Sequence, residues 1–244
     1  MTKTEAKKKI CVALDVPDSK TACALAVRLK EHVGFFKVGM ELYNAEGPSV
    51  VRTLTSLGVK IFLDLKFHDI PNTVAGVSRI VAPLGISIFN LHAAGGLEMM
   101  RACLKAASES TAKAGVPRPR IIAVTVLTSI DDATFKMVSQ SDVNVSKHVE
   151  HLARMAKEAG LDGVVASPQE IELIRAACGP NFLIVTPGVR PAGGDIGDQK
   201  RVATPAGAIR AGADILVIGR PITAAPDSVE AAEKIVEEIK SVKV

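Results

Sequence analysis

Short runs of apolar residues recur along the whole chain and alternate with segments of mixed character. Eight of these runs are rich in β-branched residues and nearly continuous in hydrophobicity, which is typical of parallel strands buried on both faces. They lie at residues 10–16, 34–40, 59–65, 86–92, 120–127, 162–167, 182–188 and 214–220. The pattern therefore predicts buried parallel strands rather than half-exposed antiparallel ones.

The segments between the runs carry apolar residues at helical spacing. The clearest are residues 19–33, 75–85, 97–115, 145–160, 168–178 and 204–212, and a last helix is predicted over 227–242. Many of them end in glycine, which favours helix C-termini. Eight strand-then-helix units in 244 residues predict an α/β fold, a single (β/α)8 TIM barrel spanning residues 1–244. A doubly wound sheet is the alternative.

Composition narrows the classes of partner. The net charge is only +4, and one Tyr and no Trp leave little material for stacking nucleic-acid bases, so we expect no nucleic-acid partner. No apolar run is long enough to span a bilayer, which predicts no membrane partner. The four cysteines lack metal-ligand spacing, as expected of buried thiols in a reducing compartment. We therefore expect a cytoplasmic protein that binds a small anionic ligand.

Charged residues gather where the predicted strands end, which is where a barrel of this type carries its function. They are Asp15, Lys37, Asp64, Lys66 and Arg220. Asp64 and Lys66 are two apart on a strand and should share a face, while Asp69 follows just before the next helix. Carboxylates on both sides would keep Lys66 protonated, ready to donate a proton to a carbanion. A salt-bridge lattice that merely closes the barrel mouth is the alternative.

A second group of motifs lies near the C-terminus: TPGVRP at 186–191, GDQKR at 197–201 and DILVIGRPI at 214–222. The glycine-rich stretch 188–203 predicts an active-site loop that grips phosphate. Gly219 and Arg220 end the last strand, where such barrels often bind phosphate. An ordinary long loop beside an unremarkable arginine is the alternative.

Two other pairs of polar residues give weaker signals. Asn90 and His92 are candidate pocket-floor residues, although satisfied core polar groups are the more economical interpretation. His148 and His151 lie three apart on a predicted helix without a third ligand, so we predict no metal site there.

The segment at 64–73, D-x-K-x-x-D-I-P-N-T, resembles the signature of the orotidine 5′-phosphate decarboxylase family. The similarity extends over essentially the whole chain, through ALDV, FFKVGMELY, NLHAAGG, VTVLTS, VTPGVRP, GDQKR and VIGRPI. The D-x-K-x-x-D core also occurs in Mg²⁺-dependent relatives, the 3-keto-gulonate 6-phosphate decarboxylases and hexulose-phosphate synthases. The continuation into I-P-N-T favours the orotidylate enzymes.

The resemblance implies decarboxylation of orotidine 5′-phosphate to UMP and CO2 without metal or organic cofactor, the last step of de novo pyrimidine synthesis. The catalytic residues it implies are Lys37, Asp64, Lys66 and Asp69. The substrate-binding residues it implies are Asp15, Lys37, Asp64, Thr73, Thr128, Pro187, Arg190, Gln199, Gly219 and Arg220. It also implies a homodimer in which Asp69 and Thr73 reach into the neighbouring site. A Mg²⁺-dependent relative and a non-catalytic sensor of phosphoribosyl ligands remain the alternatives.

Overall fold

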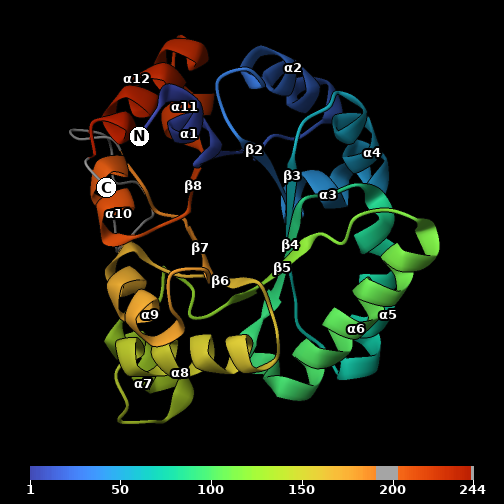
Figure 1. Ribbon diagram of the computed structural model, residues 1–244, viewed down its shortest axis with the longest axis vertical. Helices are drawn as coiled ribbons and strands as arrows, with labels where there is room; N and C mark the ends of the chain where they lie inside the picture. The colour runs from blue at the N-terminus through green and yellow to red at the C-terminus, as the bar shows by residue number, and fades with distance from the viewer. Residues whose placement is uncertain (191–202, 243–244) are drawn as a thin grey trace.

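The strands of the chain close into a barrel, as Figure 1 shows for the computed structural model, which describes residues 1–190 and 203–242. The strands follow one another around the ring in chain order, every neighbouring pair is parallel, and β1 pairs with β8. They are β1 (Ile10–Ala13), β2 (Phe35–Gly39), β3 (Ile61–Phe67), β4 (Ile88–His92), β5 (Arg120–Val124), β6 (Gly163–Val165), β7 (Leu183–Thr186) and β8 (Ile215–Ile218). The predicted barrel is confirmed. The doubly wound sheet is wrong, because β1 pairs with β8 and closes the ring, whereas a doubly wound sheet is open and has two edge strands.

The helices form a ring outside the barrel (Figure 1). They are α1 (Lys3–Lys8), α2 (Ser19–Leu29), α3 (Met40–Glu46), α4 (Pro48–Ser56), α5 (Pro71–Val81), α6 (Gly96–Ala114), α7 (Asp132–Ser139), α8 (Val145–Glu158), α9 (Ile171–Cys178), α10 (Pro205–Ala211), α11 (Arg220–Thr223) and α12 (Ser228–Lys240). Every helix that the sequence pattern predicts is present. The pattern did not single out α1, α3, α4, α7 and α11.

Side chains of the strands alternate between two apolar layers. One layer faces the helices and merges with their buried sides, as Val12, Leu63 and Phe89 do. The other fills the barrel interior and comprises Cys11, Ala13, Phe62, Ile88, Ile122, Leu183, Val185, Ile215 and Val217, with Phe35 and Val165 packed against them. The interior is thus a packed core rather than a channel, and polar chemistry is confined to the carboxyl ends of the strands.

Local sequence signals fix where the helices begin and end. Asn144 caps α8 by accepting a hydrogen bond from the backbone N–H of Lys147 at 2.9 Å. Gly115 and Gly212 follow α6 and α10 with φ of 68° and 107°, a left-handed conformation that glycine adopts at little cost. The predicted glycine C-caps are therefore confirmed at these helices.

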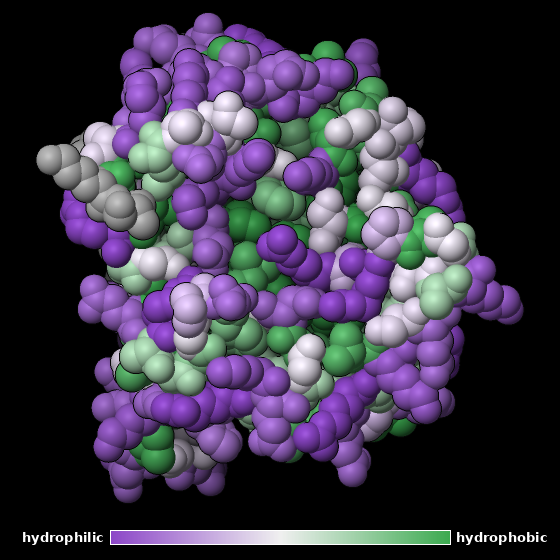
Figure 2. Space-filling model, viewed as in Figure 1, coloured by the Kyte–Doolittle hydropathy of each residue, from purple (hydrophilic) through white to green (hydrophobic). Residues whose placement is uncertain are grey.

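The surface is hydrophilic over most of the face drawn in Figure 2, and hydrophobic residues show mainly toward its middle. Within residues 1–190 and 203–242, no helix has the length and apolar character needed to cross a membrane.

Candidate active site

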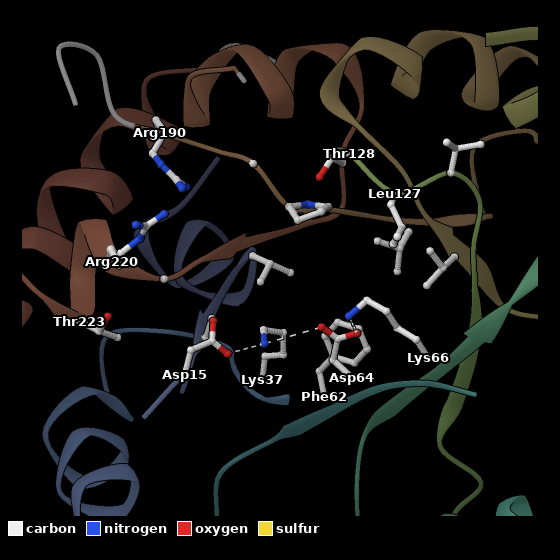
Figure 3. Close-up of a pocket in the computed structure, with 18 residues that line it drawn as sticks. Asp15, Lys37, Phe62, Asp64, Lys66, Leu127, Thr128, Arg190, Arg220 and Thr223 are labelled. Atoms are coloured by element: carbon white, nitrogen blue, oxygen red, sulfur yellow. Dashed lines mark hydrogen bonds and ion pairs between the residues drawn. The ribbon is translucent and has the colours of Figure 1, made fainter. Parts of the chain in front are cut away.

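A cavity of about 440 Å³ opens at the carboxyl ends of the strands (Figure 3). Its residues come from nearly every strand end: Ala13, Asp15, Lys37, Phe62, Asp64, Lys66, Val124, Val126, Leu127, Thr128, Val165, Pro187, Gly188, Arg190, Val217, Gly219, Arg220 and Thr223. The lining combines an apolar floor with a few charged groups, as in many sites for small polar ligands.

Four charged side chains form a chain of alternating sign along one side of the cavity (Figure 3). Lys37 Nζ lies 2.8 Å from Asp15 Oδ1 and 3.7 Å from Asp64 Oδ2. Asp64 Oδ1 in turn accepts a hydrogen bond from Lys66 Nζ at 2.8 Å. The side chains of Lys37 and Asp64 are only 10% and 12% exposed, so little water screens their attraction.

The two buried members of this chain stabilise each other's charge. Burial disfavours the carboxylate of Asp64, but Lys37 and Lys66, with hydrogen bonds from Lys66 and Asn90, outweigh it and lower the pKa of Asp64. Burial likewise disfavours the ammonium of Lys37, but the carboxylates of Asp64 and Asp15 raise the pKa of Lys37 above its usual value. Both groups are therefore charged at neutral pH.

An irregularity in β3 brings Asp64 and Lys66 together. Leu63 pairs with Phe89 and Phe67 pairs with Leu91, so three residues of β3 face the single residue Asn90 of β4. Lys66 has φ of 53°, a left-handed conformation that is uncommon for a residue with a side chain. The sequence predicts a regular strand whose alternation puts both side chains on one face. The two side chains do meet, but the strand there is bulged.

Two arginines lie on the opposite side of the cavity from Asp64 and Lys66 (Figure 3). Arg220 begins α11 directly after Gly219, and Arg190 follows β7. The backbone N–H of Arg190 donates to the carbonyl of Ala203 at 3.0 Å, so the two ends of the predicted 188–203 loop are joined beside the cavity. Guanidinium groups converging on one place can hold a dianion such as a phosphate.

Most residues predicted from the sequence come together here. The cavity contains Asp15, Lys37, Asp64, Lys66, Thr128, Pro187, Arg190, Gly219 and Arg220. Asp69 and Thr73 do not line it: both are exposed, one in the β3–α5 connection and the other in the first turn of α5. Gln199 lies outside the described residues.

Two kinds of residue escaped the sequence analysis. Val124, Val126 and Val165 line the cavity with apolar surface that the sequence does not distinguish from ordinary core. Asn90 was interpreted as a satisfied core polar residue, and it is fully buried, yet its amide binds Asp64 directly. Only its place at the end of a strand next to β3 could have indicated this.

No group of three or more His, Cys, Asp or Glu side chains within residues 1–190 and 203–242 is arranged to hold a metal ion. His148 and His151 lie with their ring centres 6.5 Å apart on α8.

Comparisons with known proteins agree with this geometry. A family model described as "Orotidine 5'-phosphate decarboxylase / HUMPS family" matches residues 8–235. The chain is 55% identical to the orotidine 5'-phosphate decarboxylase of Moorella thermoacetica, over 100% of this chain and 96% of that protein. It is 52% identical to the one from Geobacter sp. (strain M21), over 98% and 99%. The crystal structure of the enzyme from Lactobacillus acidophilus superimposes with a TM-score of 0.83 at 39% identity, covering 95% of this chain and 99% of that one.

Proposed function

This chain belongs to the orotidine 5'-phosphate decarboxylase / HUMPS family and decarboxylates orotidine 5′-phosphate in pyrimidine biosynthesis, and we propose that the cavity at the barrel mouth carries out this reaction. The observation that supports the proposal is that one cavity contains both a chain of alternating charges and a pair of arginines. An alternating chain of carboxylates and ammonium groups lies on one side of the cavity and two arginines lie on the other (Figure 3).

The reaction needs a group that stabilises a carbanion and then protonates it. When the bond between C6 and the carboxylate breaks, its electron pair stays on C6 and the carboxylate leaves as CO2. Lys66 places an ammonium group at this point, stabilises the negative charge, and donates a proton to C6 to give UMP. The resulting amine is reprotonated by solvent. Asp64, which is itself paired with Lys37, holds this ammonium in place before the reaction begins, so no reorganisation is needed as charge develops.

Substrate binding divides between the two sides of the cavity. Arg190, Gly219 and Arg220 hold the phosphate, and Gln199 of the 188–203 loop bridges phosphate and base. Asp15, Lys37 and Thr73 bind ribose hydroxyls, and Thr128 contacts the pyrimidine beside Pro187. Because the phosphate lies far from C6, its binding energy can be used to close the site and exclude water, which raises turnover as well as affinity.

The active unit is a homodimer. Asp69 and Thr73 are exposed and lie outside their own cavity, and Ile70 between them is 67% exposed. This exposure fits a site shared between two subunits. Asp69 and Thr73 enter the partner's cavity, and Ile70 packs at the interface between the subunits. Asp69 thereby completes the alternating charges around Lys66.

The protein works in the cytoplasm. All four cysteines, Cys11, Cys23, Cys103 and Cys178, are free, which suits a reducing compartment.

The reaction can be tested directly in the presence of a chelator. Purified protein mixed with orotidine 5′-phosphate and EDTA should convert it to UMP, followed by the change in ultraviolet absorbance. No conversion, with UMP binding intact, would instead favour a ligand sensor or one of the Mg²⁺-dependent relatives that act on a sugar phosphate.

Lys66→Ala distinguishes an enzyme from a ligand sensor. The variant should lose nearly all turnover, because both the stabilising charge and the proton donor are removed, yet it should still bind UMP through the arginines and ribose contacts. Isothermal titration with UMP gives the affinity. Unchanged turnover in this variant would contradict the proposed role of Lys66.

A further inference from the structure

We propose that Asn90 is a positioning residue for the decarboxylation, which sets the geometry of the Asp64–Lys66 pair from outside the cavity. Its side chain binds both partners at once. The amide Nδ2 donates to Asp64 Oδ1 at 2.7 Å, and the amide Oδ1 accepts from the backbone N–H of Lys66 at 2.8 Å. The inference rests on the proposed role of this pair in catalysis.

Asn90 stands opposite the bulge in β3. It is the one residue of β4 between the pairs Leu63–Phe89 and Phe67–Leu91, whereas β3 places three residues in the same interval. A regular ladder would join the two backbones there, but the bulge interrupts it. In place of a backbone carbonyl, the side chain of Asn90 accepts the hydrogen bond from the backbone N–H of Lys66. Asn90 therefore holds the bulge in the shape that carries both charged residues.

The conformation of Lys66 needs such support. A left-handed φ is unfavourable for a residue with a side chain, and it persists only where surrounding contacts enforce it. The hydrogen bond from the Lys66 N–H to Asn90 is the contact that fixes this peptide. The strained backbone aims the side chain of Lys66 back toward Asp64, where its Nζ donates to the same oxygen that accepts from Asn90.

The chemistry of an amide fits this place better than that of other side chains of its size. Asn90 has no exposed surface, and it must offer a donor to a carboxylate and an acceptor to a backbone N–H. A carboxylate would lack the donor, and an apolar group would lack both. A neutral amide also leaves the charge balance among Lys37, Asp64 and Lys66 unchanged.

Asn90→Leu removes both hydrogen bonds while keeping the number and branching of the side-chain heavy atoms. We expect kcat to fall about 10- to 100-fold, the range known for residues that orient a metal ligand from behind, with a smaller change in UMP affinity. Hydrogen exchange of the Lys66 amide should also become faster, and this can be measured whether or not the protein turns over orotidine 5′-phosphate. A failure of the proposed function would appear as inactivity of the unmodified enzyme, and the amide exchange would still test Asn90.

Asn90→Asp gives a readout that a purely structural role would not move. The new carboxyl group would face Asp64 and Lys66 on β3, with Lys37 of β2 near the other oxygen of Asp64 and His92 two residues along its own strand; its paired residue on β5 is Ile122. Two carboxyl groups in contact retain one proton to higher pH than either alone. With that proton the pair reproduces the donor and acceptor of the amide; without it the carboxylates repel. The kcat of Asn90→Asp relative to unmodified enzyme should therefore rise as the pH falls.

Thr111→Val is the matched control. Thr111 is buried on α6 and donates to the carbonyl of Ala107 at 2.8 Å, so the variant loses a buried hydrogen bond without touching the site. We expect it to reduce thermal stability and leave kcat unchanged. The proposal would be overturned if Asn90→Leu kept full kcat, or if both Asn90 variants lost UMP affinity as severely as kcat. If Asn90→Leu does not fold, the pH dependence of Asn90→Asp decides, and a constant ratio to unmodified enzyme would overturn it.

Discussion

At the scale of single residues, the site depends on charges that are held in place by their neighbours. Asp64 is the centre of this arrangement, since it accepts from Lys66 and Asn90 and lies 3.7 Å from the ammonium of Lys37. Its pKa is lowered in the folded protein despite burial. The folded state is therefore stabilised by the ionised form of Asp64, and this contribution depends on pH.

The sign of that dependence gives a prediction for Asp64→Asn. A carboxyl group whose pKa is lowered by folding stabilises the protein above its unfolded pKa of about 4, and the contribution disappears as the pH falls through the folded value. The difference in unfolding free energy between the unmodified protein and Asp64→Asn should therefore be full at neutral pH and shrink below about pH 4. Denaturant unfolding at a series of pH values measures it.

Glu158→Gln is the control for that experiment. Glu158 is 62% exposed and lies 3.2 Å from Arg101 on the surface, where ion pairs contribute little. Its substitution should change stability slightly at every pH. A difference for Asp64→Asn that stayed constant down to strongly acidic pH would contradict the assigned cause.

At the scale of elements, regular patterns were predictable from the sequence and irregular ones were not. Continuous apolar runs identified the strands, and helical spacing identified α8, whose buried side packs on β5, β6 and α9. The bulge in β3 was not predictable, because the letters of IFLDLKF look like an ordinary strand. It depends on Asn90 in another strand, and such a contact leaves no mark on local periodicity.

The beginning of α8 gives the prediction at this scale. Asn144→Ala removes the acceptor for the backbone N–H of Lys147 and should destabilise the protein by about 1 kcal/mol. Asn144→Ser keeps an oxygen at the cap and should be nearly neutral. Thermal unfolding of both variants makes the comparison, and equal destabilisation by the two would show that the cap is not the cause.

At the scale of the whole molecule, the proposed shared site determines what mixed subunits can do. Lys66→Ala and Asp69→Ala chains should each be nearly inactive alone. In a mixed dimer, however, one site has both residues intact and the other lacks both. A random equal mixture should regain activity at about a quarter of its sites, since half of the dimers are mixed and each has one good site.

A second mixture controls for this result. Lys66 and Asp64 come from the same chain and are in contact, so mixing Lys66→Ala with Asp64→Ala leaves every site lacking one of them. No activity should return after refolding this mixture. If the Lys66→Ala and Asp69→Ala mixture also stayed inactive while native mass spectrometry showed mixed dimers, Asp69 would not belong to the partner's site.

The sequence also predicted part of the candidate site, namely the charged residues at the strand ends. Their position at the ends of predicted strands singled out five residues, because a barrel brings the ends of all its strands to one rim. These residues are Asp15, Lys37, Asp64, Lys66 and Arg220, and all of them line the cavity. Asp69 and Thr73 were tied to a neighbouring subunit only by resemblance, since the residues of one chain carry no record of its partner's position.

The packed interior beneath the cavity determines how substrate enters and how products leave. Cys11, Ile88, Ile122, Leu183 and Ile215 fill the barrel below the charged residues, so packed core closes the inner end of the cavity, which opens at the strand ends. Orotidine 5′-phosphate, CO2 and UMP must all pass through the same rim. In the proposed binding mode, CO2 is released at the inner end, against Asp64 and Lys66, and the nucleotide lies between it and the exit. The gas therefore leaves past the bound product or waits until UMP has gone.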